Sequence, residues 1–319
     1  MQLQITYILY FVATAFISLI ILLNLKKFGI YIKEKKKSKI YIAGGFFIAV
    51  NLIIYLIYNI IFFKEINNLI IILSFLSFLI GFADDKYNLS PSSRLFSISL
   101  LVLILTSQNS TYEVNFIQIF NTIFVIKFPI SIIFTIICFL LITNALNFAD
   151  GINCLAISIF LFVYTYILLN YFNNSILLLS LILILIFLFI LNWLNICYLG
   201  DGGIYLLSFL LSVFIINTYK YNYISFSAEK IFLLLYLPGI DLVRLFFVRM
   251  YKQKNPFLGD KMHLHHYLQN KYGSKKALLF YIIVLITPIT LVDVFLINKI
   301  FIFLLSFPIY LIFLYHAKN

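Results

Sequence analysis

Charge is scarce in this chain of 319 residues, and so are proline, glycine and cysteine. Only 11% of the residues are charged, against about a quarter in soluble domains, which excludes an ordinary soluble domain and a charged, disordered chain. With 6 prolines and 11 glycines, the sequence contains no flexible linker. The three cysteines form no Cys-x-x-Cys pair, so we interpret them as small apolar residues and not as a disulfide scaffold or a metal site.

Hydrophobic residues dominate instead. They make up 64% of the chain, and the mean hydropathy is +1.08. Because a helix needs about 20 apolar residues to cross a bilayer, we predict an all-α, polytopic membrane bundle of about 11 helices in one domain, residues 1–319. The first apolar run is too long for a cleavable signal peptide. The expected spans are 5–25, 40–63, 68–83, 94–108, 129–147, 152–171, 174–194, 203–219, 230–250, 276–296 and 299–316, with 109–128 outside the membrane.

The net charge of +12 is interpreted as an orientation signal and not as a nucleic-acid surface. If the loop after the first span is cytoplasmic, eighteen of the 23 Lys and Arg residues fall on the cytoplasmic side. We therefore predict that the N-terminus lies outside and the C-terminus inside. The same alternation places five acids on the cytoplasmic side, which partly supports it independently: Asp84, Asp85, Asp150, Asp201 and Asp260.

Two polar motifs follow apolar spans. Asp84 and Asp85 are adjacent carboxylates, which are costly at a membrane and are normally relieved by a cation or a proton. The alternative is a solvated helix end. Asn144, Asn147 and Asp150 are spaced three apart, so a helix places them on one face and favours a polar cleft. Here the alternative is a helix end followed by an Asp-Gly turn.

Two further motifs complete the set. Asp201 lies between glycines in Leu199-Gly200-Asp201-Gly202-Gly203, where a ligand can approach closely, although an interhelical turn is the alternative. His263, His265 and His266 follow Asp260 and Lys261 in a basic loop, which favours zinc or, equally, an anion such as phosphate. Acids facing a loop of His, Lys and Arg are typical of phosphate chemistry with Mg²⁺. No P-loop or kinase signature is present, so ATP hydrolysis is not indicated.

These four motifs, in this order, resemble those of the polyprenyl-phosphate N-acetylhexosamine-1-phosphate transferases, which are glycosyltransferase family 4 enzymes of the WecA/TagO type and, more distantly, of the MraY type. The resemblance implies a membrane enzyme that joins an N-acetylhexosamine 1-phosphate from a UDP-sugar to undecaprenyl phosphate. The products would be a lipid-diphosphate sugar and UMP, and the reaction would initiate O-antigen or other cell-envelope glycan synthesis. It further implies a bacterial inner-membrane protein with catalytic loops near 84–94, 144–153, 199–203 and 249–276 on the cytoplasmic side.

The resemblance also implies roles for individual residues. Mg²⁺, with Mn²⁺ as an alternative, is expected at Asp201. The remaining candidates fall into two groups, and a homodimer is left open. The expected catalytic residues are Asp84, Asp85, Asp150, His263, His265 and His266, and the expected substrate-binding residues are Asn144, Asn147, Arg94, Arg249 and Lys261. Gly44-Gly45, and Pro238, Asp241 and Arg244 before the histidine loop, also match the family pattern.

The sequence departs from that pattern at four positions. Asn88 and Asn153 replace aspartates, Cys154 replaces a glycine and Ile204 replaces a serine, which points to a different amino sugar or a subfamily variant. Three other functions stay open at this point. They are an MraY-like phospho-N-acetylmuramoyl-pentapeptide transferase, an ion-coupled transporter, whose acids would lie deeper in the spans, and a prenyltransferase, which would need wider aspartate spacing.

Overall fold

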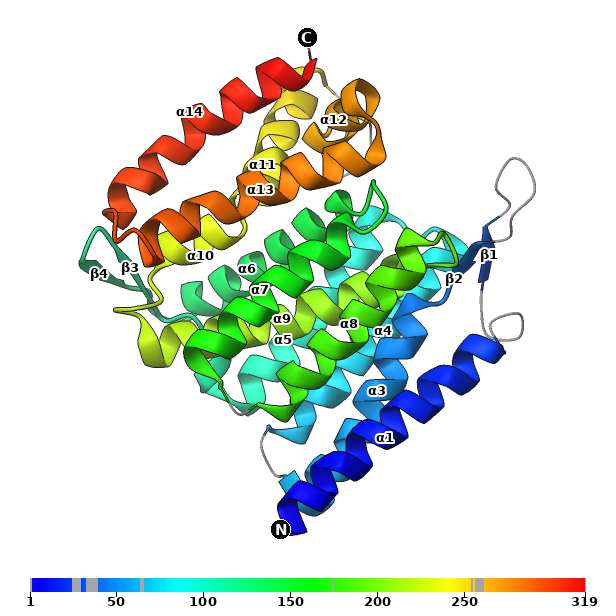
Figure 1. Ribbon diagram of the computed structural model, residues 1–319. Helices are drawn as coiled ribbons and strands as arrows, with labels where there is room; N and C mark the ends of the chain where they lie inside the picture. Colours follow the sequence, from blue (N-terminus) through cyan, green and yellow to red (C-terminus); the bar gives the residue numbers. More distant parts are fainter. Residues whose placement is uncertain are drawn as a thin grey trace. The chain divides into compact units, whose positions relative to one another are not determined.

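The computed structural model describes residues 2–24, 30–32, 40–63, 66–173, 175–253, 255 and 261–318 (Figure 1). The structure is 79% helical. The chain divides into two compact units: unit 1 comprises Met1–Leu101 and Phe160–Leu211, and unit 2 comprises Val102–Ile159 and Ser212–Asn319. The unit boundaries fall inside three helices, α5 (Pro91–Gln108), α7 (Leu155–Tyr171) and α9 (Gly200–Asn222).

Unit 1 is built around α3, which contacts α1, α4 and α8. The long apolar runs of these segments make helices because only a helix satisfies its own backbone groups in a bilayer. Besides parts of α5, α7 and α9, the unit contains α1 (Gln2–Leu23), α3 (Gly44–Tyr58), a π-helical turn η1 (Asn59–Phe63), α4 (Asn68–Tyr87) and α8 (Ile176–Trp193).

A small sheet joins the starts of two helices in unit 1. Strand β2 (Ile40–Ile42) pairs antiparallel with β1 (Ile30–Ile32) and parallel with β5 (Cys197–Tyr198), with Tyr41 opposite Cys197. Because β2 runs into α3 and β5 runs into α9, the pairing brings these two helix starts together. The N–H of Gly45 donates to the carbonyl of Leu199 at 3.0 Å.

Unit 2 consists of helices around α11, together with a hairpin. The bounds are η2 (Ser110–Tyr112), β3 (Phe116–Ile119), β4 (Thr122–Val125), α6 (Ile130–Ala149), α10 (Ala228–Leu234), α11 (Tyr236–Tyr251), α12 (Leu264–Tyr272), α13 (Ser274–Asp293) and α14 (Lys299–Lys318). Helix α11 packs against α6 and α14, and α12 packs against α13 and α14. The predicted excursion 109–128 forms η2 and the β3–β4 hairpin.

Within the described residues, eight helices are long and apolar enough to cross a membrane: α1, α3 with η1, α4, α6, α8, α9, α13 and α14. The segment predicted as one span over 230–250 is instead two helices, α10 and α11, that meet at 86°. Pro238 lies in the first turn of α11 and lacks an N–H, so one continuous helix would lose a backbone hydrogen bond there. Helix α7 is a shorter apolar helix, and α5 is not among the eight.

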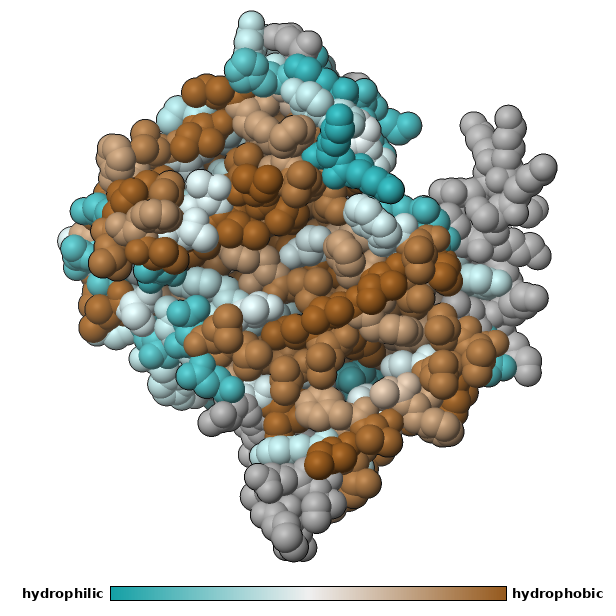
Figure 2. Space-filling view, viewed as in Figure 1, coloured by the Kyte–Doolittle hydropathy of each residue, from teal (hydrophilic) through white to brown (hydrophobic). Residues whose placement is uncertain are grey.

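The surface of these helices is that of a multi-pass membrane protein. Figure 2 shows hydrophobic residues over much of the visible face, and large apolar side chains are exposed along single helices, such as Leu183, Ile186 and Ile190 of α8. In water, apolar patches of this extent are rare in monomeric proteins. In a bilayer they face lipid.

Candidate active site

Unit 1 places Asp84 at the end of α4, where three donors hold its buried carboxylate. Arg94 Nη1 lies 2.9 Å from Oδ2, the Tyr205 hydroxyl donates to the same oxygen at 3.2 Å, and the N–H of Leu89 donates to Oδ1 at 2.9 Å. The Arg94 side chain is 25% exposed, whereas Asp84 is 4% exposed. Asp84 therefore fixes an arginine whose guanidinium remains accessible to a second anion.

Asp85 contacts the start of α9. Its Oδ1 accepts from the N–H of Asp201 at 3.0 Å, and its Oδ2 accepts from the N–H of Gly202 at 3.1 Å. The first N–H groups of a helix have no partner within the helix and carry a partial positive charge, so a carboxylate there is stabilising. Asp85 thus places a partly exposed Asp201 in the first turn of the helix.

Glycines explain how α3, α4 and α9 approach so closely. A Cβ on Gly81 would lie 2.3 Å from the carbonyl oxygen of Asp201, and a Cβ on Gly45 would lie 2.6 Å from the nitrogen of Gly203. Gly200 has φ +74°, which a residue with a side chain rarely adopts. The alternative of a plain interhelical turn for the Gly200–Gly203 motif is wrong: it is the first turn of α9.

Unit 2 places Asn144, Asn147 and Asp150 at the end of α6. Asn144 donates to the carbonyl of Leu140 at 2.7 Å, and Asp150, an exposed residue, ends the helix with its N–H on the carbonyl of Asn147 at 3.2 Å. The following turn contains Cys154 at φ +68°. That is a left-handed conformation, so the position suits the glycine that the family pattern has there.

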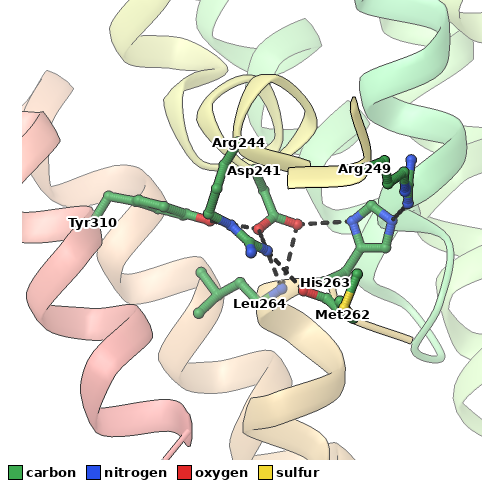
Figure 3. Close-up of polar contacts among 7 residues, drawn as sticks. All are labelled: Asp241, Arg244, Arg249, Met262, His263, Leu264 and Tyr310. Carbon is green, nitrogen blue, oxygen red and sulfur yellow. Dashed lines mark hydrogen bonds and ion pairs between the residues drawn. The ribbon is translucent and has the colours of Figure 1, made fainter. Parts of the chain in front are cut away.

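The centre of unit 2 is Asp241, a buried residue of α11 (Figure 3). Its Oδ2 lies 2.8 Å from Nδ1 of His263, and its Oδ1 accepts from Arg244 Nη2 at 2.8 Å and from the Tyr310 hydroxyl at 2.5 Å. The N–H of Leu264 also donates to this carboxylate. One acid therefore connects α11, the start of α12 and α14.

His263 and Arg249 are both buried and lie beside Phe148 of α6. Arg249 Nη2 lies 3.4 Å from Nε2 of His263, its guanidinium lies 5.3 Å from the centre of the Phe148 ring, and the His263 ring lies 5.1 Å from it. Phe148 belongs to the Asn147–Asp150 motif. Unit 2 therefore brings the asparagine motif and the histidine motif together.

His265 packs against the Asp150-Gly151 turn. A Cβ on Gly151 would lie 2.1 Å from His265 Nε2, so only glycine fits. This nitrogen is buried and has no hydrogen-bond partner among the described residues. Burial, together with the nearby His266 and His263, lowers the pKa of His265 to about 3, and burial also lowers the pKa of His266. His265 is therefore a neutral imidazole at physiological pH.

The remaining predicted residues are Lys261, which is exposed, and Asp260, which lies outside the described residues. Among the residues that the structure describes, no group of three or more His, Cys, Asp or Glu side chains could hold a metal ion. Asp201 supplies one carboxylate with hard oxygen donors. Such a carboxylate fits Mg²⁺, which is commonly held by one or two carboxylates plus substrate phosphates.

Comparison with known proteins covers the first three motifs. Residues 67–219, a little under half of the chain, match the family model described as Glycosyl transferase family 4. The match supports this superfamily. It includes Asp84, Asp85, Asp150 and Asp201, and it supports a sugar-phosphate transferase that acts on a polyprenyl phosphate. No curated protein matched the sequence.

Sequence reasoning missed the partners of these residues. Tyr205 and Tyr310 each donate a hydrogen bond to a buried aspartate. The chain has many tyrosines, and these two belong to no sequence motif that would mark them. Asp241 and Arg244 were noted only as part of a family stretch. Their spacing of three along a helix was a usable signal, because it predicts a side-chain pair on one face.

Proposed function

We propose that this protein transfers an N-acetylhexosamine 1-phosphate from a UDP-sugar to undecaprenyl phosphate. An oxygen of the lipid phosphate forms a bond to the phosphorus that carries the sugar, and the bond from this phosphorus to the oxygen of UMP breaks, so that UMP leaves. The observation that carries the proposal is a cluster inside the segment that matches the family: Asp84 and Asp85 at the end of α4, Arg94 near the start of α5, and Asp201 in the first turn of α9.

In this cluster we assign the lipid phosphate to Arg94. The Arg94 side chain is a quarter exposed and its guanidinium is already oriented by Asp84, so it can bind a phosphate oxygen without first being ordered. Asp84 and Asp85 position the phosphate or accept its proton. The donor chemistry fits Mg²⁺ or Mn²⁺ at Asp201, where the ion, when bound, would neutralise charge on the diphosphate oxygens.

In unit 2 we assign the diphosphate of the sugar nucleotide to His263, His266, Arg249 and Lys261, with Asn144, Asn147 and Asp150 lining the same site. The packing of Phe148 against His263 and Arg249, and of Gly151 against His265, supports a shared site for the two motifs. Of these four residues, Arg249 and Lys261 are charged donors, which suit phosphate oxygens. A histidine loop of this type favours the WecA/TagO type over the MraY type.

The topology belongs to the same proposal. Eleven spans would require α5, α7 and the α10–α11 pair to cross the membrane in addition to the eight helices that qualify. With the N-terminus outside and the C-terminus inside, the active site would face the cytoplasm of a bacterium, where UDP-sugars are made. The product would initiate O-antigen or another cell-envelope glycan.

The test uses membranes that contain the full chain, undecaprenyl phosphate and a panel of labelled UDP-amino sugars, with mass spectrometry of the lipid product. We expect a lipid-diphosphate sugar and an equal amount of UMP. UDP-N-acetylmuramoyl-pentapeptide belongs in the panel, since product from it alone would favour the MraY type. If no amino sugar gives lipid-linked product and no UMP is released, the proposal fails.

A matched pair of variants tests the metal assignment. Asp201→Asn should abolish turnover, because an amide is a poor ligand for Mg²⁺. Asp293→Asn removes a carboxylate of α13 that pairs with Lys230 at 2.6 Å, and it should leave turnover within about twofold of wild type. Full activity of Asp201→Asn would remove the assignment of the metal to this residue.

A further inference from the structure

We infer that Asp241 is a positioning residue that fixes the tautomer of His263 and, through it, the orientation of Arg249. The inference rests on the proposed function only for its activity readout, since the tautomer can be measured without substrate. His263 and Arg249 are the two buried groups that the proposal assigns to the diphosphate. Asp241 contacts His263 directly, and His263 in turn contacts Arg249.

The tautomer follows from the two neighbours of the imidazole. A carboxylate can only accept a hydrogen bond, and a guanidinium can only donate one. Asp241 Oδ2 lies 2.8 Å from Nδ1, which therefore carries the proton. Arg249 Nη2 lies 3.4 Å from Nε2, which therefore presents its lone pair. Both contacts select the same tautomer of His263, with the proton on Nδ1.

The Asp241 carboxylate cannot rotate away from His263, because its other oxygen is held from the opposite side. Oδ1 accepts from Arg244 at 2.8 Å and from Tyr310 at 2.5 Å, so rotation of the carboxylate would break two strong hydrogen bonds (Figure 3). Arg244 is anchored in turn by the carbonyl of Met262 at 2.7 Å. The network thus fixes the residue just before the histidine as well as the histidine itself.

The two oxygens of Asp241 have different neighbours, since Oδ1 faces two donors and Oδ2 faces His263. This difference makes the Asp241→Asn variant informative. The amide oxygen would occupy the Oδ1 position, where Arg244 and Tyr310 both donate. The amide NH₂ would then face Nδ1 of His263 and require a lone pair there. The proton would move to Nε2 and point at the guanidinium of Arg249, so that two donors face each other. The variant therefore keeps the shape of the site and inverts the tautomer.

The first measurement is solid-state NMR of the full-length protein in lipid bilayers with isotope-labelled histidine. The His263 signals are identified by their loss in His263→Gln. Wild type should show a protonated Nδ1 and an unprotonated Nε2. Asp241→Asn should show the reverse. If the wild type carries its proton on Nε2, the inference is wrong, whether or not any variant folds.

The second measurement is the kinetics of the transferase reaction. Asp241→Asn should lower kcat/KM for the UDP-sugar by about 10- to 100-fold, the range seen when the carboxylate partner of a functional histidine is removed. Tyr310→Phe is the matched comparison: it deletes a donor to the same carboxylate and an acceptor for Arg244 Nε, but it keeps the Asp241 carboxylate as the partner of His263 and keeps Arg244 on Oδ1. It should retain the wild-type tautomer and lose no more than about tenfold, the usual effect of one hydrogen bond.

The outcomes separate a positioning role from a structural one. An inverted tautomer together with reduced kcat/KM supports the inference. An Asp241→Asn protein that keeps the Nδ1 proton, or that turns over normally with the inverted tautomer, overturns it. Lack of product from the wild type would count against the proposed function, while the wild-type NMR spectrum would still decide the tautomer.

Discussion

The carboxylate of Asp85 accepts a hydrogen bond from the backbone N–H of Asp201 at 3.0 Å. These two aspartates, which the sequence predicts as a catalytic residue and a metal ligand, are therefore also connected structurally: Asp85 caps the first turn of α9, which contains Asp201. Because the contact uses the backbone and not the side chain of Asp201, that side chain stays partly exposed while its position is fixed.

The Asp85 cap gives the first prediction. Asp85→Ala should lower the free energy of unfolding by about 1–2 kcal/mol, the usual cost of losing a helix cap near the positive end of the dipole. Asp85→Asn keeps one accepting oxygen and should lose less than half of that. The measurement is thermal unfolding in detergent, with product formation followed in parallel. Equal stability of the two variants and wild type would show that the contact does not stabilise α9.

The close approach of α4 and α9 gives the second prediction. Gly81→Ala would place a Cβ 2.3 Å from a backbone oxygen of Asp201, so the helices must separate. We expect a loss of about 1–3 kcal/mol, as for other overpacked sites, together with loss of product. Gly239→Ala is the control, because nothing lies within 4 Å of the added Cβ, and it should be neutral or slightly stabilising. A Gly81→Ala protein as stable as Gly239→Ala would contradict the packing described for this glycine.

The buried imidazole of His265 predicts a dependence of stability on acid. Its pKa is about 3 in the folded protein and about 6.5 in an unfolded chain, so between these values the unfolded state binds the extra proton. Stability should therefore be complete above about pH 6.5 and should fall as the pH is lowered toward 3. Thermal unfolding between about pH 7.5 and 5 checks this.

The control for this pH dependence is a pair of variants. His265→Gln should make the fall of Tm with decreasing pH shallower, because the variant lacks the imidazole whose pKa is lowered in the folded protein. His316→Gln, at an exposed position of α14, should leave the slope unchanged. A wild-type Tm that does not fall in acid, or a His265→Gln slope equal to that of wild type, would refute this account of His265.

The left-handed conformation of Cys154 gives the fourth prediction. Cys154→Val should be destabilising by about 2 kcal/mol or more, because a β-branched residue at φ +68° is a strong outlier. Cys154→Gly should stay within about 1 kcal/mol of wild type, since relief of the backbone offsets the loss of a small buried side chain. Cys138→Val, in the regular helix α6, is the control and should be tolerated. Equal losses from valine at positions 138 and 154 would count against a backbone cause.

The sequence predicted the helices well because their signal is local. Each predicted apolar stretch is mostly helical, including 94–108 on α5 and 152–171 on α7, although 40–63 begins with β2 and 230–250 covers two helices. Length and hydropathy do not, however, tell a straight span from a broken one. The bend between α10 and α11 depends on Pro238 in a particular turn, which a hydropathy pattern averages away.

The site was predictable in its residues and not in its connections. The motifs containing Asp84, Asp201 and His263 were recognisable because each combines costly polar groups with an apolar setting. Their partners come from distant parts of the chain: Tyr205 reaches Asp84, and Tyr310 reaches Asp241. No spacing rule relates such pairs, since the contacts exist only after helices have packed.

The interleaving of the two units has a consequence for biogenesis. Unit 1 needs residues up to Leu211, whereas unit 2 opens at Val102 and is closed only by the C-terminal helices. During synthesis, the segment 102–159 leaves the ribosome before the second half of unit 1 exists. Insertion order and packing order therefore differ, and no single truncation releases either unit free of residues of the other. A chain split between Asn173 and Ser175 and co-expressed as two fragments would have to rebuild both units from both halves.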